Sequence, residues 1–135
     1  RERDREILWR APVGGARQVS EVGGRLIVPS SEGFVVAVEK DTGKVLWKFE
    51  LDSGVPTEVT VADGVLSFGS SDQFFYGLDL EGRPVFRFNA GLQSGFLSSP
   101  VWDGNARRLY VVSRAGNLYC FAQHRGRKGE KNPFL

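Results

Sequence analysis

The chain has 135 residues with a formal charge of +2, and its 17 glycines and short runs of Val, Leu and Phe accompany a complete lack of methionine. This length suffices for one ordinary domain but not for two independent ones, and the composition favours many short strands with almost no helix. The small net charge, concentrated in the C-terminal "HRGRKGEKNPFL", excludes a strongly basic nucleic-acid binder.

The ends and the cysteine content give limited information on the compartment. No apolar run approaches the roughly 20 residues of a membrane-spanning helix, so we expect no direct membrane insertion. The N-terminal "RERDREILWR" is too charged for a signal peptide, so an exported form would already have lost its signal. The lone Cys120 rules out an intrachain disulfide and fits either a reducing or an export compartment.

Two sets of residues recur along the chain at a nearly constant spacing. The aromatic residues of one set are 38 and 39 positions apart, and the glycines of the other are 40 and 40 positions apart. The sets are Trp9, Trp47 and Phe86, and Gly24, Gly64 and Gly104. A period in the range of 20 to 50 residues indicates a repeat architecture.

In chain order, the first predicted element is an aromatic strand at residues 6–13, "EILWRAPV". Each later unit begins with a glycine turn and a strand of alternating apolar residues, followed by a polar hairpin loop. A strand with a small central residue comes next, and a polar turn leads to another aromatic strand. The small residues are Ala37, Gly77 and Cys120, and their recurrence suggests that a neighbouring sheet packs closely there.

Each unit therefore reads as four short antiparallel strands, A to D, joined by turns rich in Gly, Asp and Ser. A repeated four-stranded unit of about 40 residues is typical of a β-propeller blade. A β-sandwich is the alternative, and the aligned glycines and aromatics count against it.

In the turn "KDTG" we expect a positive φ at Gly43, and we expect the Asp41 side chain to accept hydrogen bonds from the backbone amides that follow it. Trp47 and Phe86 are predicted to be structural aromatics that fill the gaps between blades.

The stretch "GFVVAVEKDTGKVLWKFE" resembles the PQQ-type, BamB-like propeller repeat, and "QFFYGLDLEGRPVFRF" and "GNLYCFAQHRG" resemble it less completely. The three copies cover nearly the whole chain. The resemblance implies an all-β propeller. Because the repeat occurs in quinoprotein dehydrogenases, outer-membrane assembly lipoproteins and kinase sensor ectodomains, it leaves the function open.

The strand count predicts an incomplete ring. Residues 1–126 would form three blades, but the basic tail at 127–135 is a poor strand D for the third. Ile7, Leu8 and Trp9 would instead complete a third blade, in our interpretation that of another chain. Three blades are too few to close, so we favour a homo-oligomer, two chains giving six blades, over an excised piece of a longer propeller or a capped open crescent. Three chains with nine blades remain a variant.

Catalytic signals are weak, and we predict no catalytic, metal or cofactor-binding residues. His124 is the only histidine, and no Cys or carboxylate cluster at metal-ligand spacing accompanies it. Ser30, Ser31, Ser70 and Ser71 are interpreted as turn formers. Quinoprotein dehydrogenases with this repeat use calcium, a catalytic carboxylate and often a vicinal disulfide, which a chain with one cysteine cannot supply. The resemblance therefore does not extend to PQQ binding.

We predict instead a binding face, because loops joining strand D to the next strand A, and strand B to strand C, fall on one side of a propeller. The candidate residues are Ser31, Glu32, Asp72, Gln73, Gln93, Phe96 and Arg114. Phe96 is weighed as either a partner anchor or a buried residue. Small polar residues of strand A, including Ser20 and Thr60, should lie near the central channel.

The resulting functional hypothesis is a non-enzymatic, BamB-like scaffold in the periplasm or otherwise exported, which binds other envelope proteins or extended peptides. The alternative is a fragment or relative of a PQQ-dependent quinoprotein dehydrogenase. Binding of nucleic acid or anionic lipid through Arg125, Arg127, Lys128 and Lys131 is the weakest interpretation, and we expect no nucleic-acid partner.

Overall fold

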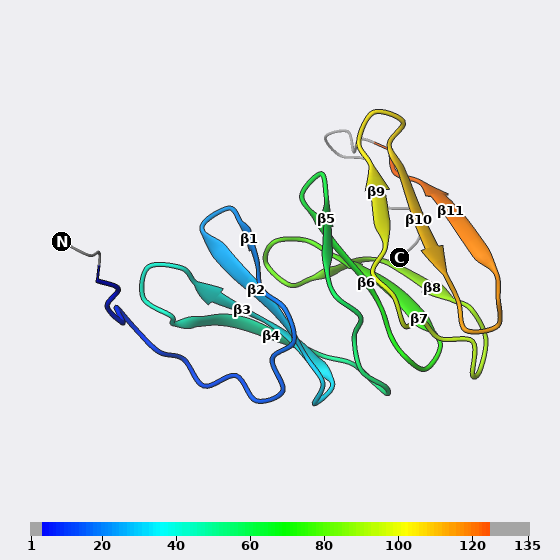
Figure 1. Cartoon of the computed structure of the whole chain (residues 1–135). Helices are drawn as coiled ribbons and strands as arrows, with labels where there is room; N and C mark the ends of the chain where they lie inside the picture. Colours follow the sequence, from blue (N-terminus) through cyan, green and yellow to red (C-terminus); the bar gives the residue numbers. More distant parts are fainter. Residues whose placement is uncertain (1–3, 125–135) are drawn as a thin grey trace.

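The computed structural model describes residues 4–124 (Figure 1). Within this range the regular secondary structure consists of β-strands, and no helix is present. The first sheet contains β1 (Ser20–Val22), β2 (Arg25–Ser30), β3 (Phe34–Glu39) and β4 (Val45–Glu50). The second contains β5 (Thr60–Ala62), β6 (Val65–Gly69), β7 (Phe74–Leu78) and β8 (Pro84–Asn89). The third contains β9 (Val101–Asp103), β10 (Arg108–Val112) and β11 (Leu118–Ala122).

Each sheet is an antiparallel meander in chain order, as expected for propeller blades. The three sheets follow one another in an arc, with the N-terminal segment at one end and β11 at the other (Figure 1). We refer to them as blades 1, 2 and 3. The prediction of four strands per unit is confirmed for blades 1 and 2, whereas blade 3 has three strands in the described range.

The short first strands, β1, β5 and β9, lie at one edge of each sheet, and residues in or just before them join neighbouring blades. Gln18 bridges blades 1 and 2, because its side chain donates to the Val59 carbonyl at 3.2 Å and accepts from the Val59 amide at 2.7 Å. The Thr60 hydroxyl donates to the Pro100 carbonyl at 2.6 Å, which joins blades 2 and 3. Small polar groups therefore tie neighbouring blades together where the backbones crowd.

The small central residues of the third strands lie opposite the aromatic residues of the fourth strands. Ala37 pairs with Trp47 in blade 1 and Gly77 pairs with Phe86 in blade 2. In both blades a β-bulge shifts the strand register directly after the small residue. The two units therefore share this irregularity as well as the paired residues. Cys120 occupies the same position on β11, and its only described sheet neighbour is β10.

Two apolar clusters hold the blades together. Between blades 1 and 2 the fully buried side chains include Ile27, Leu66 and Phe68. Between blades 2 and 3 the corresponding layer is aromatic, and Phe75 stacks on Phe121 with ring centroids 5.6 Å apart. Since burial of such side chains is the main favourable term in folding, each blade depends on its neighbours for stability.

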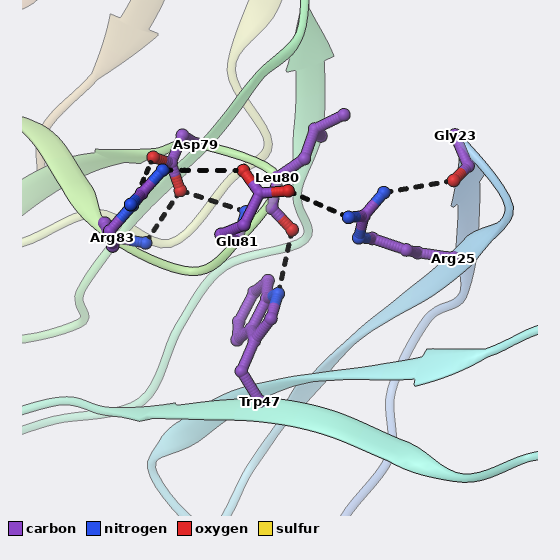
Figure 2. A network of polar contacts seen from close by, with 7 residues as sticks. All are labelled: Gly23, Arg25, Trp47, Asp79, Leu80, Glu81 and Arg83. Carbon is purple, nitrogen blue, oxygen red and sulfur yellow. Dashed lines mark hydrogen bonds and ion pairs between the residues drawn. The ribbon is translucent and has the colours of Figure 1, made fainter.

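Trp47 fastens blade 1 to the turn that precedes the last strand of blade 2 (Figure 2). Its indole Nε1 donates to the Leu80 carbonyl at 2.9 Å, and a Cβ added at Gly82 would lie 2.4 Å from the ring. Gly82 has a φ of +82°, so the same position requires both the left-handed conformation and the absence of a side chain. We call Trp47 and the turn 79–83 the blade clasp.

Charged side chains surround the blade clasp (Figure 2). Arg25 of blade 1 donates to the Glu81 carboxylate of blade 2 at 2.9 Å. Within the turn, Asp79 accepts from the backbone amides of Glu81 and Arg83 at 3.0 and 2.9 Å and from Arg83 Nε at 2.9 Å. The carboxylate of Asp79 thus organises the turn, and Trp47 then packs on it.

Trp9 repeats this arrangement on blade 1. Its Nε1 donates to the Lys40 carbonyl at 3.0 Å, and a Cβ at Gly43 would lie 2.3 Å from its ring. The predicted positive φ of Gly43 is confirmed at +76°. The expectation for Asp41 was wrong: the Lys44 amide ahead of it donates to the Thr42 hydroxyl at 3.1 Å, and the Gly43 amide donates to the carbonyl of Glu39.

Two further predictions concern the strand at residues 6–13 and the tail at residues 127–135. Residues 6–13 belong to no sheet in the described part of the chain, although Trp9 takes the position that Trp47 takes in the next unit. The predicted tail at 127–135 lies outside the described residues.

Candidate protein-binding face

The connections between blades and the hairpin turns between the second and third strands meet on one side of the molecule. In each unit one backbone hydrogen bond joins them: the Ser31 amide donates to Gly15, Ser71 to Val55, and Arg114 to Gly95, at 2.8, 2.8 and 2.7 Å. The predicted grouping of these loops is therefore confirmed. We call this surface the loop face; it comprises residues 13–15, 53–55, 89–96, 30–33, 70–73 and 113–116.

Buried serines set the shape of the hairpin turns. Ser30 Oγ donates to the Gly14 carbonyl at 2.5 Å and accepts from the Glu32 amide at 3.0 Å. In blade 2, Ser70 Oγ makes the same bonds, to the Ser53 carbonyl at 3.0 Å and from the Asp72 amide at 3.1 Å. These hydroxyls satisfy backbone groups, which confirms that they are turn formers.

The predicted polar residues of the loop face fall into two groups. Ser31 and Glu32 lie on blade 1 beside Gly14 and Gly15, and both are exposed. The other group lies where blades 2 and 3 meet, and it consists of Asp72, Gln73, Gln93 and Arg114.

In the second group several side chains already have partners on the protein. Arg114 Nη1 donates to the Ser71 carbonyl at 3.1 Å, and Gln73 Nε2 donates to Asn89 Oδ1 at 3.1 Å. Asp72 accepts a hydrogen bond from Ser53. These contacts join the hairpin turn 70–73 to the segments 53–55, 89–96 and 113–116. The backbone of this part of the loop face is therefore held in place before any partner arrives.

Phe96 was considered as an apolar anchor for a partner, and the structure places it in the core instead. Its side chain is 0% exposed, packs against Gly69, and lies 5.6 Å from the Phe75 ring centroid. It therefore does not belong to the loop face. The reason is local: its amide donates to the Ser70 carbonyl at 2.8 Å, which pulls the end of the loop into the blade.

Leu92 is the apolar residue that the loop presents to solvent, with 79% of its surface exposed. It lies between Gly91 and Gln93, which both have positive φ values, +101° and +62°. This tight backbone turn directs the loop outward. Leu92 was missed at the level of the sequence because it shares one glycine-rich loop with Phe96, and the loop pattern does not indicate which of the two is buried.

The adjacent core contains a tyrosine whose pKa is shifted by its surroundings. Burial raises the pKa of the Tyr76 phenol, the Asp52 carboxylate raises it further, and Arg87 lowers it. Tyr76 is therefore a neutral phenol in the core. Within residues 4–124 no three His, Cys, Asp or Glu side chains gather in a way that could hold a metal ion.

The described residues also include no helix long and apolar enough to cross a membrane. His124 is exposed at the end of the described range, and Cys120 is exposed on β11.

Comparisons with known proteins agree with this architecture. The family model described as "Outer membrane protein assembly factor BamB" matches residues 1–100. No curated protein sequence matches the chain at a significant level.

Among solved structures, BamB from Moraxella catarrhalis superposes with a TM-score of 0.66 at 23% identity, over 76% of this chain and 32% of that one. The quinohemoprotein alcohol dehydrogenase ADHIIG from Pseudomonas putida HK5 superposes with a TM-score of 0.60 at 16% identity, over 70% of this chain and 20% of that one. The chain thus spans about a third of the first and a fifth of the second.

At these identities the two structures establish the shared propeller fold. The family model covers well over half of the sequence, including both complete blades and the blade clasp between them. The chain belongs to the family of the outer membrane protein assembly factor BamB.

Proposed function

We propose that the chain is a non-enzymatic, protein-binding scaffold of the bacterial cell envelope, working in the periplasm or an equivalent exported compartment. Membership of the BamB family supports this proposal, because that family's description is an assembly factor for outer membrane proteins. In our proposal the partners are other envelope proteins or extended peptides, and the scaffold works as a homo-oligomer, preferably a dimer.

The observation that carries the binding role is the construction of the loop face. Its backbone is fixed by three repeated hydrogen bonds, and its longest connection exposes Leu92 while burying Phe96. A rigid surface with an exposed apolar side chain beside polar groups suits a partner that offers an apolar contact and backbone hydrogen bonds. Gln93 follows Leu92 in the chain, and Arg114 is bonded to Gly95 of the same loop, so both can supply polar groups to a partner.

The test is association with barrel-assembly proteins and with an unfolded porin, measured by pulldown and biolayer interferometry. Leu92→Ser should weaken binding about tenfold, the loss of one well-buried apolar contact. Val45→Ser is the matched control, since Val45 is 54% exposed on β4, outside the loop face. Absence of association above background for the unaltered chain would remove the proposal. Equal effects of the two substitutions would show that the loop face is not the binding surface.

The likeness to a quinohemoprotein alcohol dehydrogenase keeps a second function open to a direct test. An enzyme fragment of that kind should change the absorbance of added PQQ and gain thermal stability when PQQ and calcium are both present. We expect neither change, because the described residues offer no carboxylate cluster for the metal. A saturable spectral shift together with stabilisation would favour the dehydrogenase interpretation.

A further inference from the structure

The first hairpin turn of blade 3 is longer than the corresponding turns of blades 1 and 2. Residues 23–24 join the first two strands of blade 1 and residues 63–64 those of blade 2, whereas residues 104–107 do so in blade 3. The Asp103 carboxylate shapes this longer turn, because it accepts hydrogen bonds from the amides at 105 and 106 at 3.1 and 3.2 Å. The turn ends at Arg107, which has a φ of +55°.

Arg107 joins two partners through one guanidinium. Its Nη1 donates to the Asp63 carboxylate of blade 2 at 2.7 Å, and its Nε donates to the Gln123 carbonyl of blade 3 at 2.9 Å. The guanidinium also lies 5.8 Å from the centre of the Trp102 ring. Only 22% of the Arg107 side chain is exposed, so these contacts hold it against the protein.

Gln123 adds a second bridge beside the first. Its side-chain Nε2 donates to the Ala62 carbonyl of blade 2 at 2.6 Å. Ala62 ends β5 and Asp63 follows it, so both bridges reach the same hairpin of blade 2; this hairpin and the one between β9 and β10 point the same way in Figure 1. We call Arg107, Gln123 and residues 62–63 the polar latch.

The polar latch uses the acceptor position that the blade clasp uses between blades 1 and 2. Leu80 and Gln123 each lie three residues after the small residue of their third strand, and each backbone carbonyl accepts a hydrogen bond from a side chain. The donor to Leu80 is the Trp47 indole. The counterpart of Trp47 in the next unit is Phe86, whose ring has no N–H. At the second junction the Arg107 guanidinium therefore supplies the bond that an indole supplies at the first.

The neighbouring contact changes its chemistry in the same way. Between blades 1 and 2, the Leu80 side chain lies against Gly23, where an added Cβ would be 3.3 Å from it. At the equivalent positions between blades 2 and 3, Gln123 stands in place of Leu80 and Asp63 in place of Gly23, and Asp63 pairs with Arg107. An apolar contact at one junction thus corresponds to an ion pair at the other.

We propose that the polar latch is a salt-sensitive device that keeps blade 3 docked on blade 2. Arg25 and Glu81 form an ion pair between blades 1 and 2, but the clasp bond at that junction comes from an uncharged indole. In the polar latch the charged residue supplies the bond itself, and its partner Asp63 is 54% exposed, so added salt screens the attraction.

The consequence is a difference between the two junctions as the ionic strength rises. The aromatic layer still holds blades 2 and 3 together, so we expect more frequent local opening of β9 and β10 rather than unfolding of the chain. Residues 113–116 of the loop face belong to blade 3, so the polar latch also sets how firmly that part is held. This inference stands apart from the proposed scaffold function and does not require it.

Hydrogen exchange of backbone amides, followed by mass spectrometry, measures such opening. At about 50 mM NaCl, Arg107→Gln should raise the exchange rate of the peptide 100–112 about fivefold relative to the peptide 25–39. Arg25→Gln is the matched control, because Arg25 pairs with Glu81 at the junction that keeps its tryptophan clasp. It should change either peptide less than about twofold. An effect of Arg107→Gln no larger than that of Arg25→Gln would overturn the proposal.

A salt titration separates the ionic contribution from packing. Raising NaCl from about 50 to 500 mM should increase exchange of the peptide 100–112 about two- to threefold in the unaltered chain and leave Arg107→Gln unchanged. Asp63→Asn should also remove the salt response, and asparagine suits this position because Asp63 has a φ of +52°. A salt response that persists in both variants would contradict the ionic role.

Arg107→Lys tests the double contact. Lysine keeps the charge but lacks the planar group that serves Asp63 and the Gln123 carbonyl together, so its exchange rate should fall between those of the unaltered chain and Arg107→Gln. A lysine variant as protected as the unaltered chain would show that the ion pair alone is sufficient, and would overturn the latch geometry.

Discussion

At the scale of single residues, the clearest device in this protein is the tryptophan that docks on a glycine turn of the next unit. Trp47 and Trp9 use the same indole hydrogen bond, at 2.9 and 3.0 Å, and the same close approach to a glycine. The hydrogen bond fixes the ring orientation and the glycine allows its face to approach. This combination explains why a tryptophan suits this position in the first two copies, whereas the third copy has Phe86.

Trp47→Ala should lower the free energy of unfolding by about 2–4 kcal/mol. This loss is somewhat smaller than that for a fully buried tryptophan, because the Trp47 side chain is half-buried. Trp47→Phe should cost less, since it keeps the packing and loses mainly the hydrogen bond, worth about 1 kcal/mol. Urea unfolding followed by circular dichroism gives both values. Lys48→Ala, on an exposed neighbour, is the control; a loss for Trp47→Ala no larger than for Lys48→Ala would contradict the role.

Two glycines allow the backbone and packing contributions to be separated. Gly82 and Gly64 have nearly equal φ values, +82° and +81°, but a Cβ would meet the Trp47 ring only at Gly82. Gly64→Ala should cost about 1 kcal/mol, from the left-handed conformation alone. Gly82→Ala should cost at least about 1 kcal/mol more, because the ring must shift as well. Equal losses in urea unfolding would show that the ring moves without cost.

At the scale of elements, the turn 79–83 shows how a polar side chain prepares a binding surface for a neighbouring blade. Burial by itself would raise the pKa of Asp79, but hydrogen bonds from the backbone and side chain of Arg83 and from the Glu81 amide outweigh it and leave the pKa below its usual 3.8. The charged carboxylate is thus favoured in the folded turn. Blade 1 in turn rests on this turn through Trp47.

A lowered pKa has a definite consequence for stability against pH. Asp79 contributes stability that is fully present above its ordinary pKa of 3.8 and is lost as the pH falls through the lower folded value. The difference in unfolding free energy between the unaltered chain and Asp79→Asn should therefore be constant near neutrality and shrink in strong acid. Urea titrations from pH 7 to pH 2 measure it. A difference that grows on acidification would show the opposite sign.

At the scale of the whole molecule, the blades form a chain of like units in which each stabilises its neighbours. The interior layers between blades are complete, while Leu118 at one end and Val19 at the other stay exposed. Repeat proteins need such terminal surfaces to be covered.

If the chain is the homo-oligomer proposed above, folding and association are linked. The unfolding free energy of a dimer should then rise by about 1.4 kcal/mol for each tenfold increase in concentration, and the melting temperature should rise by a few degrees. Differential scanning calorimetry from about 5 to 500 µM measures this shift. A melting temperature independent of concentration in the unaltered chain would indicate that the blades fold without a second copy.

The sequence by itself determined the units of this protein. The spacing of Trp9, Trp47 and Phe86, the alternating apolar residues and the glycine turns predicted the strands and the blade repeat, because strand period and turn chemistry are local properties. The small residues Ala37 and Gly77 could likewise be aligned before their aromatic partners were seen.

Only the tertiary structure decided which side chains face solvent where units meet. It buried Phe96 and exposed Leu92, and it assigned the amide contacts of the first turn to Thr42 rather than Asp41. It also showed Trp9 docked on the blade that follows it in sequence. Phe96 is buried by contacts with Gly69 and Ser70, and Trp9 docks on Lys40, so both outcomes depend on segments far apart in the sequence. A local pattern carries no information about the backbone that will lie against it.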